Sequence, residues 1–433
     1  MSRDHHPSRP NLLFITIDSL RADYVGLYNE SIAQAHLTPN LDRLGEHAAI
    51  FKHAFSQSVH TAPALRAMMS GNYPSRYGDW FYVLSPERPM LAEILKRNGY
   101  HTHGFHSNPY VSHHYDFNRG FDVFDDHLPK ISSKRKTLRL VARLKALLTE
   151  PYENARTITD QVLTALDSSQ RPFFVWGHYM DVHGPYISKD GHKTLSRIRA
   201  ALLWKKAMEH PERISGAERD ELIRNYKQEI AYLDRHLGEV LDKVDLDETL
   251  VVITADHGDL LGEHGLYGHS TMFYNGALHV PLLVSIPGVP RGPEQPIETP
   301  VRLIDIVPTI CTLAGLDTEE SFEGSSLASL VTGSGPDYDA DTIVSEMSRK
   351  HLCLQKDPWK LIVDYRKNVK ELYDLASDPG EGDNLLDREP SRAREMESLL
   401  QGHVQRVKPA AAQQEVAHEE EIKARLRALG YME

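Results

Sequence analysis

The chain has 433 residues, of which 40% are hydrophobic and 25% charged, with a formal net charge of −12. This length allows a large core, in two domains or in one large domain with an appendage. The negative net charge argues against non-specific nucleic-acid binding as the main role. Because Cys311 and Cys353 are the only cysteines, a disulfide scaffold and a four-cysteine zinc site are excluded.

The first eleven residues, MSRDHHPSRPN, are polar and lack the apolar core of a signal peptide. No apolar run in the sequence approaches the length of a membrane span. We therefore expect a cytoplasmic protein without a transmembrane segment.

Strand and helix patterns alternate along most of the chain. The strands are expected at Leu12–Ile17, His101–Asn108, Pro172–Asp181 and Thr249–Asp259, and the helices at Thr38–His47, Pro63–Ser70, Met90–Asn98 and Asn225–Val244. Such alternation predicts an α/β fold with a mostly parallel central sheet flanked by helices.

The pattern changes near Pro336, where a linker-like stretch precedes the short strand candidates HLCLQ, WKLIVDY and KELYDL and then charged helices. We predict a catalytic α/β domain over residues 10–335. Residues 336–433 are predicted to form a smaller C-terminal α+β subdomain, with an antiparallel sheet and terminal helices.

Polar residues follow several of the predicted strands. Asp18, Asp181, Asp256 and His257 all lie at strand ends, where ligands collect in open α/β sheets. A single aspartate there would as well be a solvated loop residue, but several metal-ligand side chains at independent strand ends predict a common site.

Two basic stretches, Ser133–Leu148 and His192–Ala207, contrast with the acidic composition. Both patterns are helical and amphipathic. They fit solvated faces packed on the core, or a rim that attracts an anionic or membrane-surface substrate, so peripheral membrane contact stays open.

The motifs NLLFITIDSLRAD, HTAPALRAMMSGNYPSRYG, HYMDVHGPY and ITADHGDLLGEHGLYGH occur in this order between Pro10 and Leu386. As an ordered set they resemble the sulfatase family of the alkaline-phosphatase superfamily. The resemblance implies an alkaline-phosphatase-like fold with one divalent cation, which leaves calcium, magnesium, manganese and zinc open.

The same resemblance implies roles for individual residues. Asp18, Asp256 and His257 match metal ligands, and Thr61 matches the nucleophile, which also contacts the metal. His183 matches a histidine that acts as general acid, and His269 stands where many sulfatases carry a lysine facing the anionic group. The resemblance implies that His269 and, by a looser match, Asn108 contact the substrate. We also expect contact by Arg66, which is adjacent to the usual arginine position, and by Asp181 at its strand end.

Three positions depart from the usual sulfatase pattern. Formylglycine arises from a cysteine or serine, whereas Thr61 cannot form it because its β carbon carries a methyl group. The usual arginine position is Leu65, beside Arg66, and the second carboxylate of the usual aspartate pair is Ser19. We therefore expect direct attack by a metal-activated Thr61 hydroxyl, with a helix behind it that directs N–H groups at the anion. The alternative is that Thr61 only caps that helix.

Three functions remain open from the sequence. The first is a metal-dependent hydrolase that cleaves a phosphate, phosphonate or sulfate ester with Thr61 as nucleophile. The second is a transferase that passes a phospho-substituent to an alcohol of a glycan or lipid headgroup. The third is a degenerate family member that binds an anionic glycan without turnover. The expected partner is in each case an anionic ester or glycan and not a nucleic acid, and the oligomeric state stays undetermined.

Overall fold

The computed structural model describes residues 9–77, 88–127, 152–187, 194–269, 271–289, 292, 295–317, 321–333, 338 and 340–407. The basic stretch at 133–148 and the helix expected after residue 408 lie outside the described residues. The predicted domain boundary between residues 335 and 336 lies outside them too, so that division stays a prediction.

A seven-stranded sheet with the order β2-β11-β7-β1-β6-β4-β5 forms the centre of the protein. The strands β1, β6, β4, β5 and β7 run parallel, and β11 and β2 add an antiparallel edge. The mostly parallel sheet expected from the sequence is confirmed. Its strands are β1 (Asn11–Ile17), β2 (Ala49–Ile50), β4 (His101–Phe105), β5 (Val123–Asp125), β6 (Phe173–Tyr179), β7 (Thr249–Ala255) and β11 (Leu282–Ser285).

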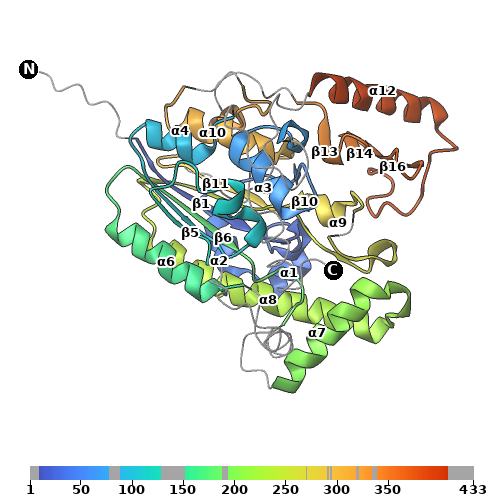
Figure 1. Cartoon of the computed structure of the whole chain (residues 1–433), viewed down its shortest axis with the longest axis horizontal. Coiled ribbons are helices and arrows are strands. Elements are labelled where there is room, and N and C mark those ends of the chain that lie inside the picture. Colours follow the sequence, from blue (N-terminus) through green and yellow to red (C-terminus); the bar gives the residue numbers. More distant parts are fainter. Residues whose placement is uncertain are drawn as a thin grey trace, which may run out of the picture.

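Helices cover both faces of this sheet (Figure 1). On one face α8 packs on both α2 and α6, and α6 also packs on β6; on the other, α3 packs on α10 and α4 on β4. The helices are α1 (Glu30–Gln34), α2 (Pro39–Gly45), α3 (Thr61–Ser70), α4 (Leu91–Arg97), α6 (Ala155–Ser168), α7 (Thr194–Glu209), α8 (Gly216–Lys243), α9 (Asn275–Leu278), α10 (Ile306–Leu313), α11 (Ala328–Thr332) and α12 (Pro390–Arg406).

The sequence explains why the central strands are buried on both faces. All seven residues of β1 are buried, as are all seven of β6 and of β7, which matches their nearly continuous apolar runs. One local expectation differs in detail: Thr38 precedes α2, but its side chain makes no cap to that helix and instead accepts the backbone N–H of Gly26 at 2.8 Å.

Short strands complete the main part of the fold. Strand β3 (Ala54–Phe55) pairs with β10 (His279–Val280) and β12 (Val301–Arg302), and β8 (Leu260–Leu261) pairs with β9 (Tyr267–Gly268). The hairpin of β8 and β9 directly follows β7 and therefore lies beside the carboxyl end of the central sheet.

The C-terminal strands form a separate antiparallel sheet, as predicted. It contains β13 (Ile343–Ser348), β14 (His351–Lys356), β15 (Trp359–Asp364) and β16 (Val369–Asp374), in that order. The first of these strands was not expected from the sequence. Helix α12 packs on β14 and β15, on the right of Figure 1.

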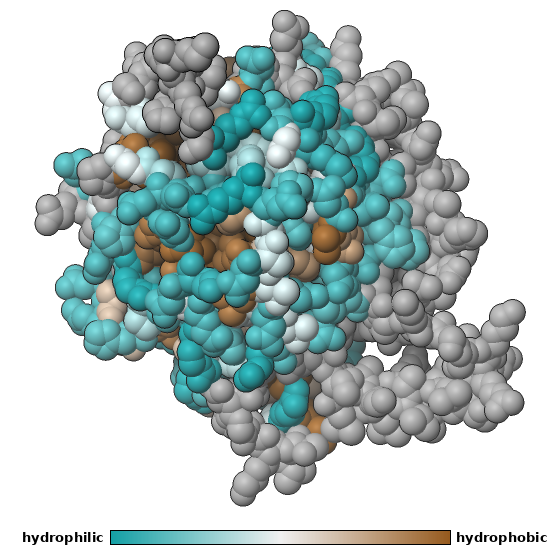
Figure 2. Space-filling view, turned by 90° about the vertical axis from the view of Figure 1, so that its left-hand side faces the viewer, coloured by the Kyte–Doolittle hydropathy of each residue, from teal (hydrophilic) through white to brown (hydrophobic). Residues whose placement is uncertain are grey.

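The surface is mixed in character. Figure 2 shows the side that lies on the left of Figure 1, where hydrophilic residues surround a smaller group of apolar ones. Such a mixture is ordinary for a folded protein. Among the helices in the described ranges, none has both the length and the hydropathy that a membrane span requires.

A buried ion pair ties the C-terminal sheet to the main part of the fold. Lys360 of β15 lies 2.6 Å from Glu381, and both side chains are almost completely buried. Both members of the pair bind Asn275 of α9, in the main part of the fold. The Asn275 side chain accepts from Lys360 at 2.8 Å, and its backbone N–H donates to Glu381 at 2.7 Å.

We predict that Lys360→Met destabilises the protein by about 3 to 5 kcal/mol, because it leaves the Glu381 carboxylate buried without its cation. The measurement is urea unfolding followed by circular dichroism. The matched control is Lys370→Met, which removes the partly exposed partner of Glu397 and should cost less than about 1 kcal/mol. Equal losses in the two variants would contradict this view of the interface.

Candidate active site

The site is built at the carboxyl ends of the three central strands. β1 pairs with both β6 and β7, with Ile17 opposite Tyr179 on one side and Ala255 on the other. Asp18 and Asp256 follow β1 and β7 directly, so this register places their carboxylates side by side. Both residues are completely buried.

A strained turn after β1 completes the carboxylate pair. Ser19 has a φ of 61°, which costs a non-glycine residue roughly 1 to 3 kcal/mol. The turn directs the backbone N–H of Ser19 to Asp256 Oδ1 at 3.2 Å, and its hydroxyl donates to Asp18 Oδ1 at 2.8 Å. Ser19 thus serves as a hydrogen-bond donor to both carboxylates.

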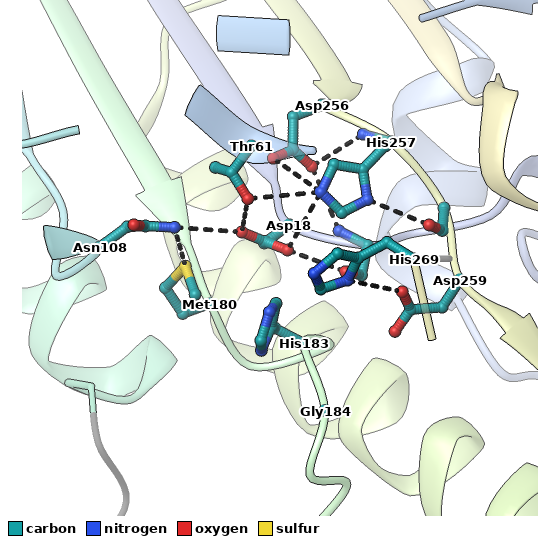
Figure 3. A network of polar contacts seen from close by, with 12 residues as sticks. Asp18, Thr61, Asn108, Met180, His183, Gly184, Asp256, His257, Asp259 and His269 are labelled. Atoms are coloured by element: carbon teal, nitrogen blue, oxygen red, sulfur yellow. Dashed lines mark hydrogen bonds and ion pairs between the residues drawn. The ribbon is translucent and has the colours of Figure 1, made fainter. Parts of the chain in front are cut away.

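Thr61 is the first residue of α3, and its hydroxyl contacts residues that follow β1 and β7. The hydroxyl donates to Asp18 Oδ2 at 3.0 Å and lies 3.3 Å from His257 Nε2 (Figure 3). Every residue of α3 is buried, and the helix ends at Gly71 in the left-handed conformation with a φ of 65°. The rigid, buried helix therefore fixes the position of the hydroxyl.

The pKa values of the two carboxylates are shifted in opposite directions. Burial and the neighbouring charge of Asp18 raise the pKa of Asp256 well above its usual value. Burial would also raise the pKa of Asp18, but His183, His178 and His257 outweigh it and hold that pKa well below its usual value. Two buried carboxylates at such short range resist simultaneous ionisation unless a cation lies between them.

These side chains form a set that could hold a metal ion. Donor atoms of Asp18, His178 and Asp256 lie within 4.8 Å of one another, and all three residues are buried. Among the described residues, Asp256 Oδ2 has no hydrogen-bond partner, as expected for an atom that serves as a ligand. The carboxylate and imidazole donors fit a divalent cation, and both predicted aspartate ligands lie in this set.

A cluster of imidazoles surrounds the hydroxyl of Thr61. The ring centroid of His269 lies 5.0 Å from that of His257 and 5.1 Å from those of His183 and His60. Burial lowers the pKa of His183, against the pull of Asp18, and burial together with His269 and His257 lowers that of His60 well below its usual value. An incoming anion would favour the protonated forms of His183 and His60.

His269 is held in place by an acidic partner. Asp259 Oδ1 lies 3.2 Å from His269 Nδ1, and Asp259 Oδ2 accepts from the hydroxyl of Tyr186 at 2.7 Å. His257, Asp259 and His269 also have donor atoms within 4.8 Å of one another. Figure 3 shows His269 and Asp259 beside His183, on the side of Asp18 away from Asn108.

The other predicted substrate residues lie at different places. Asn108 donates from its amide to Asp18 Oδ2 at 3.5 Å and so borders the carboxylates. Asp181 lies two residues beyond the end of β6, where its carboxylate accepts the N–H of Ala155 at the start of α6 at 2.9 Å. The guanidinium of Arg66 lies 5.8 Å from the centre of the Tyr115 ring. Substrate contact by these three residues stays a prediction.

Sequence reasoning missed His178, Asp259 and His60. His178 is the one histidine in the apolar run PFFVWGHYMD, and Asp259 is the last residue of the predicted strand Thr249–Asp259. In the folded chain Thr16 of β1 lies opposite His178 of β6. A sequence pattern does not show which residues of two strands lie opposite one another, so it could not place His178 at the site.

The described part of the second basic stretch has most of its charge paired within the chain. On α7, Arg199 lies 2.6 Å from Glu221 and Lys206 lies 2.7 Å from Glu218, both on α8. Helix α7 also packs Trp204 against Gly184, next to His183. These contacts support the interpretation of a packed, solvated face, and contact with a membrane stays a prediction.

The fold and the site together define an ester hydrolase of the alkaline-phosphatase-like α/β class. The chain belongs to the sulfatase family, whose sequence model matches residues 10–316. A second model, described as N-sulphoglucosamine sulphohydrolase, C-terminal, matches residues 262–409.

Known proteins of the family are distant in sequence. The chain is 25% identical to "Arylsulfatase K" of Xenopus laevis, over 86% of this chain and 79% of that protein. It is 26% identical to "Choline-sulfatase" of Rhizobium meliloti, over 88% and 83%. It also resembles the solved phosphonate monoester hydrolase of Agrobacterium radiobacter, with a TM-score of 0.71 and 19% identity over 92% and 96%, which supports the fold.

The carboxylate pair makes a testable prediction about stability. Because the folded-state pKa of Asp256 is raised above its unfolded value of about 3.9, the folded protein binds the extra proton, and stability is lost as the pH rises through the raised pKa. In chelator, Asp256→Asn should remove this loss and be at least as stable as the parent at neutral pH.

With excess Mn²⁺ the order should reverse, because a ligand at 100 times its Kd stabilises the native parent by about 2.7 kcal/mol. The variant should lose bound metal and most of this gain. The measurements are urea unfolding at pH 5 and 8, with and without chelator, and metal content by mass spectrometry. Equal metal content in variant and parent would refute the assignment of Asp256 as a ligand.

Proposed function

We propose that the protein is a metal-dependent hydrolase that cleaves a phosphate, phosphonate or sulfate ester, with Thr61 as nucleophile in place of formylglycine. The observation that carries the proposal is the position of the Thr61 hydroxyl, 3.0 Å from Asp18 and 3.3 Å from His257. A threonine that served only as a helix cap would use its hydroxyl on the backbone of its own helix. Here the hydroxyl donates to the carboxylate of another element.

The proposed reaction has two displacement steps. The Thr61 oxygen forms a bond to the phosphorus or sulfur atom and loses its proton, for which the hydrogen-bonded Asp18 is the nearest acceptor. The ester oxygen leaves with the bonding electron pair and takes a proton from His183. Water then attacks the phosphorus or sulfur atom of the threonine ester and gives a proton to His183. The Thr61 oxygen leaves with the bonding electron pair and takes back the proton held by Asp18, which releases the free anion.

A divalent cation held by Asp18, Asp256 and His257 would lower the pKa of the attacking hydroxyl and neutralise charge on the ester. The metal identity is not fixed by the carboxylates alone. His183 has a lowered pKa, so its acid form depends on the negative charge that the substrate brings.

The surroundings of Thr61 fit the recognition of an anion. His269 and His60 lie around the site with imidazole N–H donors, and the N-terminus of the ten-residue helix α3 begins at Thr61 itself. Asn108 adds an amide donor beside Asp18. We propose an anionic ester of a small molecule, glycan or lipid headgroup as the substrate.

The position of Leu65 supports a route without formylglycine. Its side chain is completely buried in the main hydrophobic core, so the arginine of the usual pattern has no counterpart at this residue. Threonine also lacks the aldehyde hydrate, which expels sulfate by breaking its own carbon–oxygen bond. Hydrolysis of the threonine intermediate needs a second attack at the central atom, which favours phosphorus esters over sulfate.

Thr61 is the direct test. Thr61→Ala should abolish turnover while the parental metal content remains, and Thr61→Ser should retain partial activity because it keeps the oxygen and loses only the methyl group that restricts its rotamer. The measurement is nitrophenol release from aryl phosphate, phosphodiester, phosphonate and sulfate substrates. Parental activity in Thr61→Ala would end the nucleophile proposal.

Trapping the intermediate adds a second readout. Acid quenching during turnover, followed by mass spectrometry, should find the transferred group on the peptide that contains residues 60–66. Addition of a glycerol acceptor separates the alternatives, because a transferase would form the glycerol ester in place of the free anion.

His183→Ala should slow alkyl esters more than nitrophenyl esters. An alkoxide leaving group needs a proton in the transition state, whereas nitrophenolate leaves without one. We expect a loss of 10²- to 10⁴-fold for alkyl substrates, the usual contribution of general acid catalysis. Steady-state kinetics on a matched alkyl and nitrophenyl pair provides the measurement, and an equal loss on both would remove the acid role.

A further inference from the structure

His178 is a completely buried histidine in the middle of the central sheet. It lies on β6 opposite Thr16 of β1, with no exposed surface. Its Nε2 lies 3.6 Å from Asp18 Oδ2, too far for a hydrogen bond, and has no other hydrogen-bond partner among the residues that the structure describes. A buried polar atom without a partner is costly and therefore needs an explanation.

The unpartnered nitrogen points into the carboxylate pair. Donor atoms of His178, Asp18 and Asp256 lie within 4.8 Å of one another, a spacing that ligands of one cation can share. The oxygen Asp256 Oδ2 lacks a partner in the same place. His178 and Asp256 thus each have a side-chain atom without a hydrogen-bond partner, and both residues belong to the same group of possible ligands.

We propose that His178 is a further protein ligand, through Nε2, of the cation that Asp18, Asp256 and His257 bind. The proposal rests on the metal-dependent function proposed above and extends its ligand set. Ser19 donates hydrogen bonds to the two carboxylates, and His178 would supply the further ligand from the neighbouring strand. The set then holds two carboxylates and two imidazoles.

The other side of the ring supports this role. His178 Nδ1 lies 2.9 Å from Thr16 Oγ1, and the indole N–H of Trp176 donates to the same oxygen at 3.0 Å. A hydroxyl oxygen has two lone pairs, so it can also accept an Nδ1–H from His178. This tautomer leaves the Nε2 lone pair directed at the cation, the arrangement that ligating histidines usually have.

The ligand set has a consequence for the choice of metal. Calcium and magnesium bind oxygen ligands almost exclusively, whereas two imidazoles favour first-row transition metals such as Mn²⁺, Co²⁺ or Zn²⁺. A site with only one imidazole and two carboxylates would discriminate less. The proposal therefore predicts that Mn²⁺ binds more tightly than Ca²⁺ and that His178 accounts for much of the difference.

The experiment is isothermal titration calorimetry on the full chain, stripped with chelator, with Mn²⁺ and Ca²⁺ as probes. We expect one Mn²⁺ per chain for the parent and at least tenfold weaker Mn²⁺ binding for His178→Ala, with a smaller loss for Ca²⁺. The matched control is His351→Ala, which removes an equally buried histidine from β14 and should leave Mn²⁺ affinity unchanged. Visible absorption of bound Co²⁺ should change in His178→Ala and not in the control.

Parental Mn²⁺ affinity in a folded His178→Ala protein would overturn the proposal, while loss of binding in Asp256→Asn would still support the metal site itself. If the parent binds no cation, the proposed function fails instead. If His178→Ala does not fold, Thr16→Val removes the Nδ1–H acceptor and keeps the histidine. It should weaken Mn²⁺ binding by about 10- to 100-fold, and parental affinity in this variant would overturn the proposal.

Discussion

The site depends on one constraint, the parallel pairing of β1 between β6 and β7. Because this register places the residues after β1 and β7 at the same edge, Asp18 and Asp256 must lie together in an environment without water. The free energy of two buried like charges is unfavourable, and the surrounding residues respond to it. The strained turn at Ser19 supplies donors, and His183, His178 and His257 hold the pKa of Asp18 below its usual value against the effect of burial.

The proposed nucleophile, Thr61, is positioned by a helix of the core rather than by a loop. Helix α3 is buried along its whole length, so the hydroxyl of Thr61 keeps its distance from Asp18 through packing that extends to Leu65 and beyond. Catalysis of ester cleavage depends strongly on such fixed geometry. Because α3 belongs to the core and also positions Thr61, a substitution in this helix can lower both the stability and the proposed activity.

Imidazoles lie around the proposed substrate site. Burial and the neighbouring histidines lower the pKa of His60 and His183. Asp259 Oδ1 lies beside Nδ1 of His269, which leaves Nε2 of that ring for an anion. Under the proposed function, the positive charge of this site would form together with the bound ester.

The sequence by itself determined the fold class, the approximate positions of the central strands and most of the residues of the candidate site. Long apolar runs that end in Asp18 and Asp256 carry this information, because burial on both faces leaves only the last position for a polar group. Tertiary structure alone decided that Thr16 lies opposite His178 and that Asp259 holds His269. Such contacts join residues far apart in the chain, and periodicity reports the face of an element but not its neighbour. For the same reason, strand β13 and the position of His178 on β6 beside Asp18 were found only in the folded chain.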